Sequence, residues 1–198
     1  MKINAIVLAA GESKRFGSHK LMQSYKGQTV LGHLLNKIEQ VSFDKVYVIT
    51  SKMTEEIVKS KENTFKTVLN IHPEEGISSS IRLGLEASEE CEAYCFIVAD
   101  QIALEVHTVQ AMLRCYRQNP QGILCAAFKE QLGNPVIFHK KYKQELMQLE
   151  GDVGGKKVLK AHLEEVVLFE VDHESELIDI DTQKDWNRLL MEESSWNN

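Results

Sequence analysis

The sequence predicts an α/β fold built on a mostly parallel central sheet. Apolar runs of strand length alternate with segments of helical periodicity along nearly the whole chain, which is typical of parallel strands joined by crossover helices. The first run, Ile3–Ala9, is apolar at every position except Asn4, as in a strand buried on both faces. The chain has 198 residues, 43% of them apolar, so we expect one domain over residues 1–198 with a sizeable core.

The first half of the chain continues this alternation. We expect strands at Lys45–Thr50 and Thr67–Ile71, with a helix between them at Thr54–Lys61 that Thr54 caps. The preceding helix is indicated by apolar residues at helical spacing, namely Val30, Leu31, Leu34, Leu35, Ile38 and Val41.

The middle of the chain holds the most apolar predicted strand. Ser79–Ser88 is predicted to be a helix, and Tyr94–Ala99 a buried strand that ends on Asp100. A helix follows and stops at Asn119-Pro120. Its apolar stripe consists of Val106, Val109, Met112, Leu113 and Tyr116.

The last third is expected to open with two strands, Gly122–Phe128 and Pro135–His139. A turn at Gly133-Asn134-Pro135 is predicted to join them, because Gly, Asn and Pro favour turns. The remaining predicted elements are helices at Lys141–Leu149 and Gly154–Leu163, a strand at Val166–Val171 and a terminal helix from Thr182.

Composition disfavours several classes of protein. A net charge of -6 argues against a surface built for the backbone of DNA or RNA. The N-terminal apolar run of seven residues is too short for a membrane span and lacks the layout of a signal peptide, so we expect a cytoplasmic protein without a membrane partner. The Cys and His residues show no zinc-like spacing, and we expect reduced, mostly buried cysteines.

A Gly-rich loop with basic residues follows the first predicted strand. The small residues Ala9, Ala10 and Gly11 would let backbone amides approach phosphate oxygens, while Arg15 and Lys20 add positive charge. The spacing is not that of a Walker A loop, since five residues separate Gly11 from the next glycine. The residues themselves predict either an anion-binding loop or a surface turn with solvated basic side chains.

Asp100 stands where ligands bind in α/β sheets, beyond the carboxyl end of a strand. Magnesium prefers oxygen ligands, usually one or two carboxylates completed by water and phosphate. The alternative is that Asp100 caps the next helix. Asp152 is a second candidate carboxylate, or part of a plain turn. Asp179 and Asp181 are expected to finish the last strand and lead into a cap at Thr182.

Several motifs, taken together, resemble those of a known family. The segment from Leu8 to Lys20 resembles the LAAGxSxRxGxxK signature of nucleotidyltransferases that act with molybdopterin, and the chain is similar to the molybdenum cofactor cytidylyltransferases. Further motifs in the family's order are Gly76–Leu85, Ala99-Asp100-Gln101, Gly133–Phe138, Gly151–Gly155 and Asp179–Thr182.

The resemblance implies a three-layer Rossmann-like fold of the nucleotide-diphospho-sugar transferase type. It implies transfer of CMP from CTP to molybdenum-bound molybdopterin, yielding molybdopterin cytosine dinucleotide and pyrophosphate, with Mg²⁺ as cofactor. The client would be a molybdenum hydroxylase such as a xanthine dehydrogenase. Cytidine rather than guanosine is implied by Ala10, because related guanylyltransferases usually carry Gly at that position.

The resemblance also implies roles for single residues. Catalytic roles fall to Arg15, Lys20 and Asp100. The nucleotide would be bound by Leu8, Ala9, Ala10, Gly11, Lys20, Gly76, Ser79 and Ser80. The metal would be held by Asp100 and Asp152, and the acceptor by Asn134, Pro135, Gly151 and Asp152. Helix capping by Ser78 or Ser79 explains the serines of this segment without a ligand.

Two positions depart from the family pattern. Ile102 replaces a proline after Asp100-Gln101, which bears on the stiffness of that loop, and Asn134 replaces a histidine. Two other functions therefore remain open: a nucleotidyltransferase that uses another phosphate acceptor or GTP, and a non-catalytic protein that carries the molybdenum cofactor.

Overall fold

The computed structural model describes residues 1–11, 13, 16–17, 19–120 and 122–196. Within this part of the chain, seven strands form the main sheet in the order β5-β4-β1-β6-β8-β7-β9. Only β8 runs antiparallel to its neighbours in that sheet. The strands, in sheet order, are Lys66–Leu69, Lys45–Thr50, Ile3–Ala9, Ala93–Val98, Gln131–His139, Ile123–Phe128 and Val166–Glu170.

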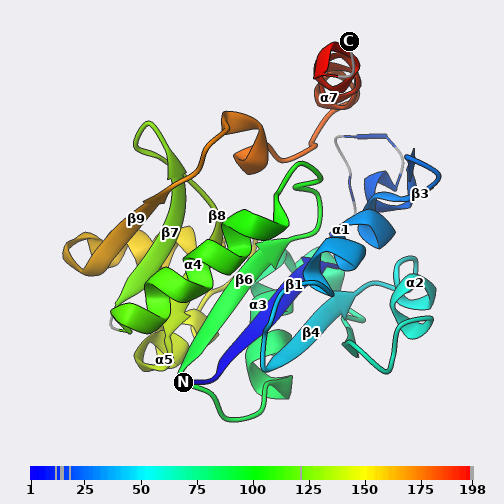
Figure 1. Ribbon diagram of the computed structural model, residues 1–198. Helices are drawn as coiled ribbons and strands as arrows, with labels where there is room; N and C mark the ends of the chain where they lie inside the picture. Colours follow the sequence, from blue (N-terminus) through cyan, green and yellow to red (C-terminus); the bar gives the residue numbers. More distant parts are fainter. Residues whose placement is uncertain (12, 14–15, 18, 121, 197–198) are drawn as a thin grey trace.

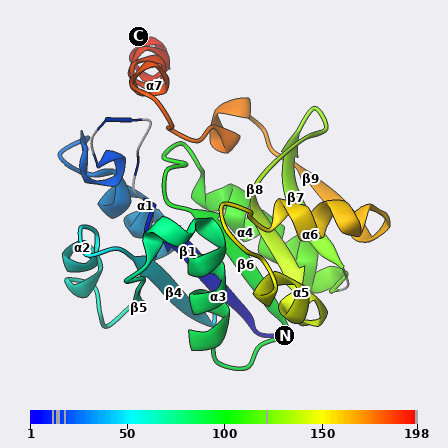
Figure 2. The same cartoon turned by 180° about the vertical axis from the view of Figure 1, so that it is seen from behind.

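Helices cover both faces of the sheet and make a three-layer molecule, as the sequence predicts (Figures 1 and 2). One face carries α1 (Val30–Ile38), α2 (Glu55–Lys59) and α4 (Val106–Gln118). The other face carries α3 (Ile77–Ala87), α5 (Lys143–Met147) and α6 (Lys156–Ala161). The helix that ends the described chain, α7 (Gln183–Trp196), stands away from the sheet in Figure 1.

The central strand β1 divides the core into two halves. Its odd-numbered residues, such as Ala5 and Val7, join the cluster under α1 and α4, whereas Ile6 joins the cluster under α3. Successive side chains of a strand point to opposite faces, so a strand covered on both sides is apolar on both. This explains why β1 is apolar apart from Asn4, whose buried Nδ2 donates to Ser88 Oγ and to the Glu89 carbonyl.

The connection between β7 and β8 differs from the prediction. The turn lies at Lys129 and Glu130, both with positive φ (47° and 68°), as in the tight turns that join hairpin strands. The predicted turn residues Gly133-Asn134-Pro135 lie inside β8, where the register shifts opposite the segment between Cys125 and Ala127. A sheet tolerates proline at such an irregularity, because no ladder hydrogen bond from its nitrogen is needed there. The Gly-Asn-Pro sequence that suggested a turn therefore marks a β-bulge within β8.

Other boundaries shift by a few residues. The helix predicted at Ser79 begins at Ile77, and a short hairpin of β2 (Ser24–Tyr25) and β3 (Gln28–Thr29) precedes α1. Short 3-10 turns supplement the α-helices at Lys20–Met22, Pro73–Glu75, Lys140–Tyr142, Leu163–Glu165 and Glu174–Leu177. No helix among the described residues is both long enough and apolar enough to cross a membrane.

The cap predicted for the terminal helix is confirmed. Thr182 Oγ1 accepts a hydrogen bond from the Asp185 amide (3.2 Å), and Asp185 Oδ2 accepts one from the Thr182 amide (2.7 Å). This reciprocal pair satisfies two donors that the first helical turn leaves without partners. It fixes the start of α7 directly after the segment that contains Asp181.

Candidate functional site

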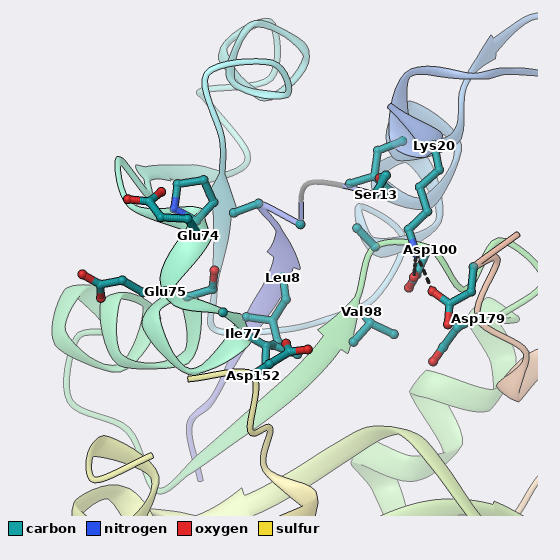
Figure 3. A pocket seen from close by; sticks show the side chains of 18 of the residues that line it. Leu8, Ser13, Lys20, Glu74, Glu75, Ile77, Val98, Asp100, Asp152 and Asp179 are labelled. Atoms are coloured by element: carbon teal, nitrogen blue, oxygen red, sulfur yellow. Dashed lines mark hydrogen bonds and ion pairs between the residues drawn. The ribbon is translucent and has the colours of Figure 1, made fainter. Parts of the chain in front are cut away.

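A cavity of about 620 Å³ opens at the carboxyl ends of β1 and β6. Figure 3 shows its wall, with Leu8 and Val98 from the ends of these strands on its floor. Ligands in open α/β sheets bind at this edge, because the loops that follow neighbouring parallel strands meet there. The described lining also draws on residues within 73–80, 151–152 and 179–181.

One end of the cavity is organised around Lys20. Its Nζ donates to Asp100 Oδ2 at 2.5 Å and to Asp181 Oδ1 at 3.0 Å (Figure 3). Burial lowers the pKa of Lys20, but the two carboxylates outweigh it and raise the pKa above its usual value. The ammonium is therefore charged at neutral pH, and two carboxylates from distant parts of the chain hold it.

Asp179 adds a third carboxylate to this end of the cavity. Partial burial, followed by the charges of Asp100 and Asp181, raises the pKa of Asp179 from 3.8 to about 6. The side chain still has surface open to the cavity, so solvent screens part of the burial effect, while the repulsion from neighbouring carboxylates remains. The Ile180 amide donates to the Asp100 carbonyl (3.3 Å) and ties this segment to the end of β6.

The expectation that Asp179 and Asp181 finish the last strand is wrong. Both line the cavity, and β9 ends at Glu170, well before them. A signal was present in the sequence: in an extended segment, residues two apart share a face, and the apolar Ile180 between them is buried. The alternation of Asp, Ile and Asp thus predicts two carboxylates on one side.

The loop after Asp100 is held firmly although it lacks the family's proline. Lys37 Nζ, from α1, donates to the carbonyls of Ile102 (3.1 Å) and Leu104 (2.8 Å). The buried Gln101 donates from Nε2 to the Leu177 carbonyl at 3.2 Å. These contacts immobilise backbone that proline would otherwise stiffen, so Ile102 does not leave the loop without support.

The loop after β1 forms another wall. Leu8, Ala10 and Gly11 line the cavity, while Ala9 is fully buried behind it. A Cβ added to Gly11 would meet nothing within 4 Å, so backbone is open to the cavity at this point. Arg15 lies outside the residues that the structure describes.

Gly76 connects the start of α3 to the loop at Gly151. Its φ is +86°, and an added Cβ would lie 2.5 Å from the carbonyl oxygen of Gly151 and 2.6 Å from the Asp152 nitrogen. The Ser78 amide also donates to the Gly151 carbonyl, at 3.3 Å. Only glycine fits both the conformation and the space at position 76. The two segments therefore form one continuous wall.

The two predicted serines differ in their surroundings. Ser80 lines the cavity, whereas Ser79 lies outside its lining. Asn70 Nδ2 donates to Ser79 Oγ (2.8 Å) and Ser80 Oγ (3.1 Å), and Ser79 Oγ donates to the Gly76 carbonyl (2.8 Å). Ser79 thus holds the Gly76 turn in place from behind.

The residues predicted to bind the metal do not lie together, and neither do those predicted to bind the acceptor. Asp152 lies beside Ile77, away from the pair of Lys20 and Asp100 (Figure 3). Gly151 and Asp152 line the cavity, as do Glu74 and Glu75, which the sequence analysis did not single out. Asn134 and Pro135 lie in β8 and are outside the lining.

The sheet order, the three layers and an acid-lined cavity at the strand ends define a nucleotidyltransferase fold of Rossmann-like type. The chain belongs to the family described as MobA-like NTP transferase domain, which matches residues 5–166.

The chain is also similar to several curated proteins. The chain is 25% identical over 195 residues to the purine catabolism protein PucB of Bacillus subtilis, covering 93% of this chain and 94% of PucB. It is 32% identical over 88 residues to a probable molybdenum cofactor guanylyltransferase of Pyrococcus horikoshii, covering 42% of this chain and 45% of that protein. The bifunctional protein GlmU of Legionella pneumophila is 30% identical over 141 residues, 68% of this chain, and the match spans only 30% of GlmU.

A solved structure shows the same fold over nearly the whole chain. Rv0371c of Mycobacterium tuberculosis superimposes with a TM-score of 0.83 at 25% identity, covering 96% of this chain and 98% of that protein. Its complex with manganese gives a TM-score of 0.80 at 23% identity, covering 96% and 99%.

Proposed function

We propose that this protein transfers CMP from CTP to molybdenum-bound molybdopterin, releasing pyrophosphate and forming molybdopterin cytosine dinucleotide. The observation that carries the proposal is the position of Lys20, held between Asp100 and Asp181 at the edge of a cavity whose other wall is the Ala10-Gly11 loop.

The carboxylates of this cavity fit a divalent cation. Asp100 and Asp181 already share one cation, the Lys20 ammonium, and carboxylate oxygens are the ligands that Mg²⁺ prefers. We propose that Asp100 holds Mg²⁺ together with Asp181, in the role that the sequence analysis gave to Asp152. A bound divalent cation neutralises charge on phosphate oxygens and stabilises the leaving pyrophosphate. The complex of Rv0371c with manganese makes Mn²⁺ a sensible second probe.

The protein's own groups position the substrates. Lys20, once it leaves the carboxylates, reaches the triphosphate as a compact positive charge, and the small residues Ala10 and Gly11 admit the phosphates close to backbone. The attacking group is a phosphate monoester, largely dianionic at neutral pH because its second pKa is about 6. It needs no general base, and catalysis consists of in-line positioning and charge neutralisation.

Two comparisons support the molybdenum cofactor as acceptor. One relative is a probable molybdenum cofactor guanylyltransferase, and PucB, which matches along nearly its full length, is a purine catabolism protein. A purine-oxidising molybdenum hydroxylase such as a xanthine dehydrogenase is the client that we propose. The acceptor would enter beside Gly151 and Asp152, whereas Asn134 and Pro135 lie in β8, outside the cavity lining.

The test is a reaction with purified protein, Mg²⁺, molybdenum cofactor and either CTP or GTP, followed as pyrophosphate release. We expect release that requires the acceptor and is faster with CTP. Preferential release with GTP would correct the base but keep the reaction. Cofactor binding without any release would contradict the transferase and identify a carrier, and release only with another phosphate acceptor would overturn the choice of molybdopterin.

A further inference from the structure

Thr54 makes an unusual connection between two loops. It occupies the N-cap position of α2, yet its side chain makes no capping hydrogen bond. Instead Oγ1 donates to the carbonyl of Ala9 at 3.0 Å and accepts from the Ser51 amide at 3.0 Å. The side chain is buried, with 4% of the residue exposed. Thr54 therefore links the end of β4 to the end of β1.

The Ala9 carbonyl lies at the point where β1 leaves the sheet. The last register pair of β1 with β4 joins Ala9 to Thr50, and on the other side the Ala99 amide bonds to the Leu8 carbonyl. A buried carbonyl needs a donor, and here a side chain supplies it where the strand ladder stops. The direction of the chain after Ala9 is thereby fixed.

The next two residues, Ala10 and Gly11, line the cavity. We propose that Thr54 is a positioning residue for nucleotide binding: its hydroxyl orients the Ala9 peptide, and through it the Ala10-Gly11 backbone that approaches the triphosphate. The inference rests on the proposed function. Thr54 itself touches no substrate, since it lies outside the cavity lining.

Matched variants separate positioning from general stability. Thr54→Val removes the hydroxyl and keeps the shape, and Thr54→Ser restores the donor. Thr50→Val is the control: Thr50 is equally buried and its Oγ1 donates to the Val68 carbonyl (3.4 Å), on the side of β4 away from β1. All three are compared with wild type by calorimetric titration with CTP and Mg²⁺, well below their melting temperatures, and by steady-state kinetics.

We expect Thr54→Val to weaken nucleotide binding by about tenfold, since a misoriented peptide loses hydrogen bonds to phosphate, each a charge-assisted contact. KM for CTP rises accordingly, while kcat changes less. Thr54→Ser stays within about twofold of wild type, because it keeps the donor. Thr50→Val lowers the melting temperature without changing the dissociation constant of CTP.

The inference is overturned if Thr54→Val binds CTP like wild type, or if Thr50→Val weakens binding to the same degree. Should Thr54→Val fail to fold, Thr54→Cys takes its place, because the thiol is a weaker hydrogen-bond donor of similar size. We expect this variant to lose an intermediate part of its affinity for CTP. A wild-type protein that binds neither CTP nor GTP overturns the proposed function itself, and this inference with it. Wild-type binding with an unchanged Thr54→Val overturns only the role of Thr54.

Discussion

Lys20 Nζ lies 2.5 Å from Asp100 Oδ2, although the two residues are 80 positions apart in the chain. Only 13% of the Lys20 side chain and 15% of the Asp100 side chain are exposed. Partly buried pairs are screened less than surface pairs, so this contact is a substantial electrostatic feature of the cavity. It joins the loop after β1 to the end of β6 and makes both residues natural targets for mutation.

Lys20→Ala and Asp100→Asn are each expected to lower turnover by about tenfold or more, because each removes a charge that meets the triphosphate or its metal. Steady-state pyrophosphate release measures this loss, and circular dichroism checks that both variants fold. Lys59→Ala is the control, since Lys59 lies on α2, pairs with Glu55 and is 49% exposed. Wild-type rates in both cavity variants would remove the proposed mechanism.

Asp179→Asn is expected to stabilise the metal-free protein at pH 7. The pKa of Asp179 is raised from 3.8 to about 6 in the folded state, so its ionisation costs more in the folded than in the unfolded state, and stability is lost as the pH rises through this window. At about pH 4 the folded carboxyl is protonated while roughly half of the unfolded carboxyl is ionised, so the advantage of Asn should fall to a small part of its value at pH 7. Thermal melts between pH 4 and pH 7 with a chelator present measure this trend.

Glu56→Gln serves as the comparison for that series, because the Glu56 side chain is 84% exposed and its pairing with Lys59 is solvent-screened. We expect its melting temperature to track that of wild type across the same pH range. A gain for Asp179→Asn that does not shrink between pH 7 and pH 4 would contradict repulsion among the carboxylates as its cause.

Gly76→Ala is expected to lower the melting temperature by about 5 °C or more, since it combines strain at positive φ with a clash against the Gly151 backbone. Gly11→Ala is its matched partner. A Cβ at Gly11 meets no protein atom within 4 Å, so this variant should melt like wild type while binding CTP more weakly. Equal melting temperatures for both variants would show that the Gly76 contact does not support the wall.

Ala10→Gly is expected to shift the ratio of kcat/KM values toward GTP. Ala10 is buried and lines the cavity, and its methyl group is the one that the resemblance described above implies as the difference between a cytidylyltransferase and a guanylyltransferase. A difference of one methyl group changes discrimination by roughly 10- to 200-fold. Competition between CTP and GTP in one reaction measures the ratio, and an unchanged ratio would mean that the base is recognised elsewhere.

The fold could be predicted because its signals are local. The mostly apolar run of β1 and the helical stripes of α1 and α4 each identify an element without knowledge of its neighbours. The β7–β8 connection was missed because Gly133-Asn134-Pro135 has turn composition but lies in a bulge. The true turn at Lys129 and Glu130 lacks Gly or Asn, the residues that favour positive φ.

Only the part of the site that has a local sequence signal could be predicted. Asp100 follows an apolar strand closely, and its place at the sheet edge could be inferred from the sequence. The role of Asp181 depends on a chain path that returns to β6 through the contact between Ile180 and Asp100, which no local pattern encodes. The support that Lys37 gives to the loop at Ile102 is also a contact between distant segments.

The position of Lys20 has a consequence for the order in which ligands load. In the free protein the Lys20 ammonium partly neutralises Asp100 and Asp181. A divalent ion must displace this ammonium in order to bind the two carboxylates. A triphosphate offers that ammonium a new anionic partner. We therefore expect Mg²⁺ to bind the protein weakly when it is added alone and tightly when CTP is present. Lys20 would thus keep metal ions from occupying the carboxylates until the nucleotide is bound.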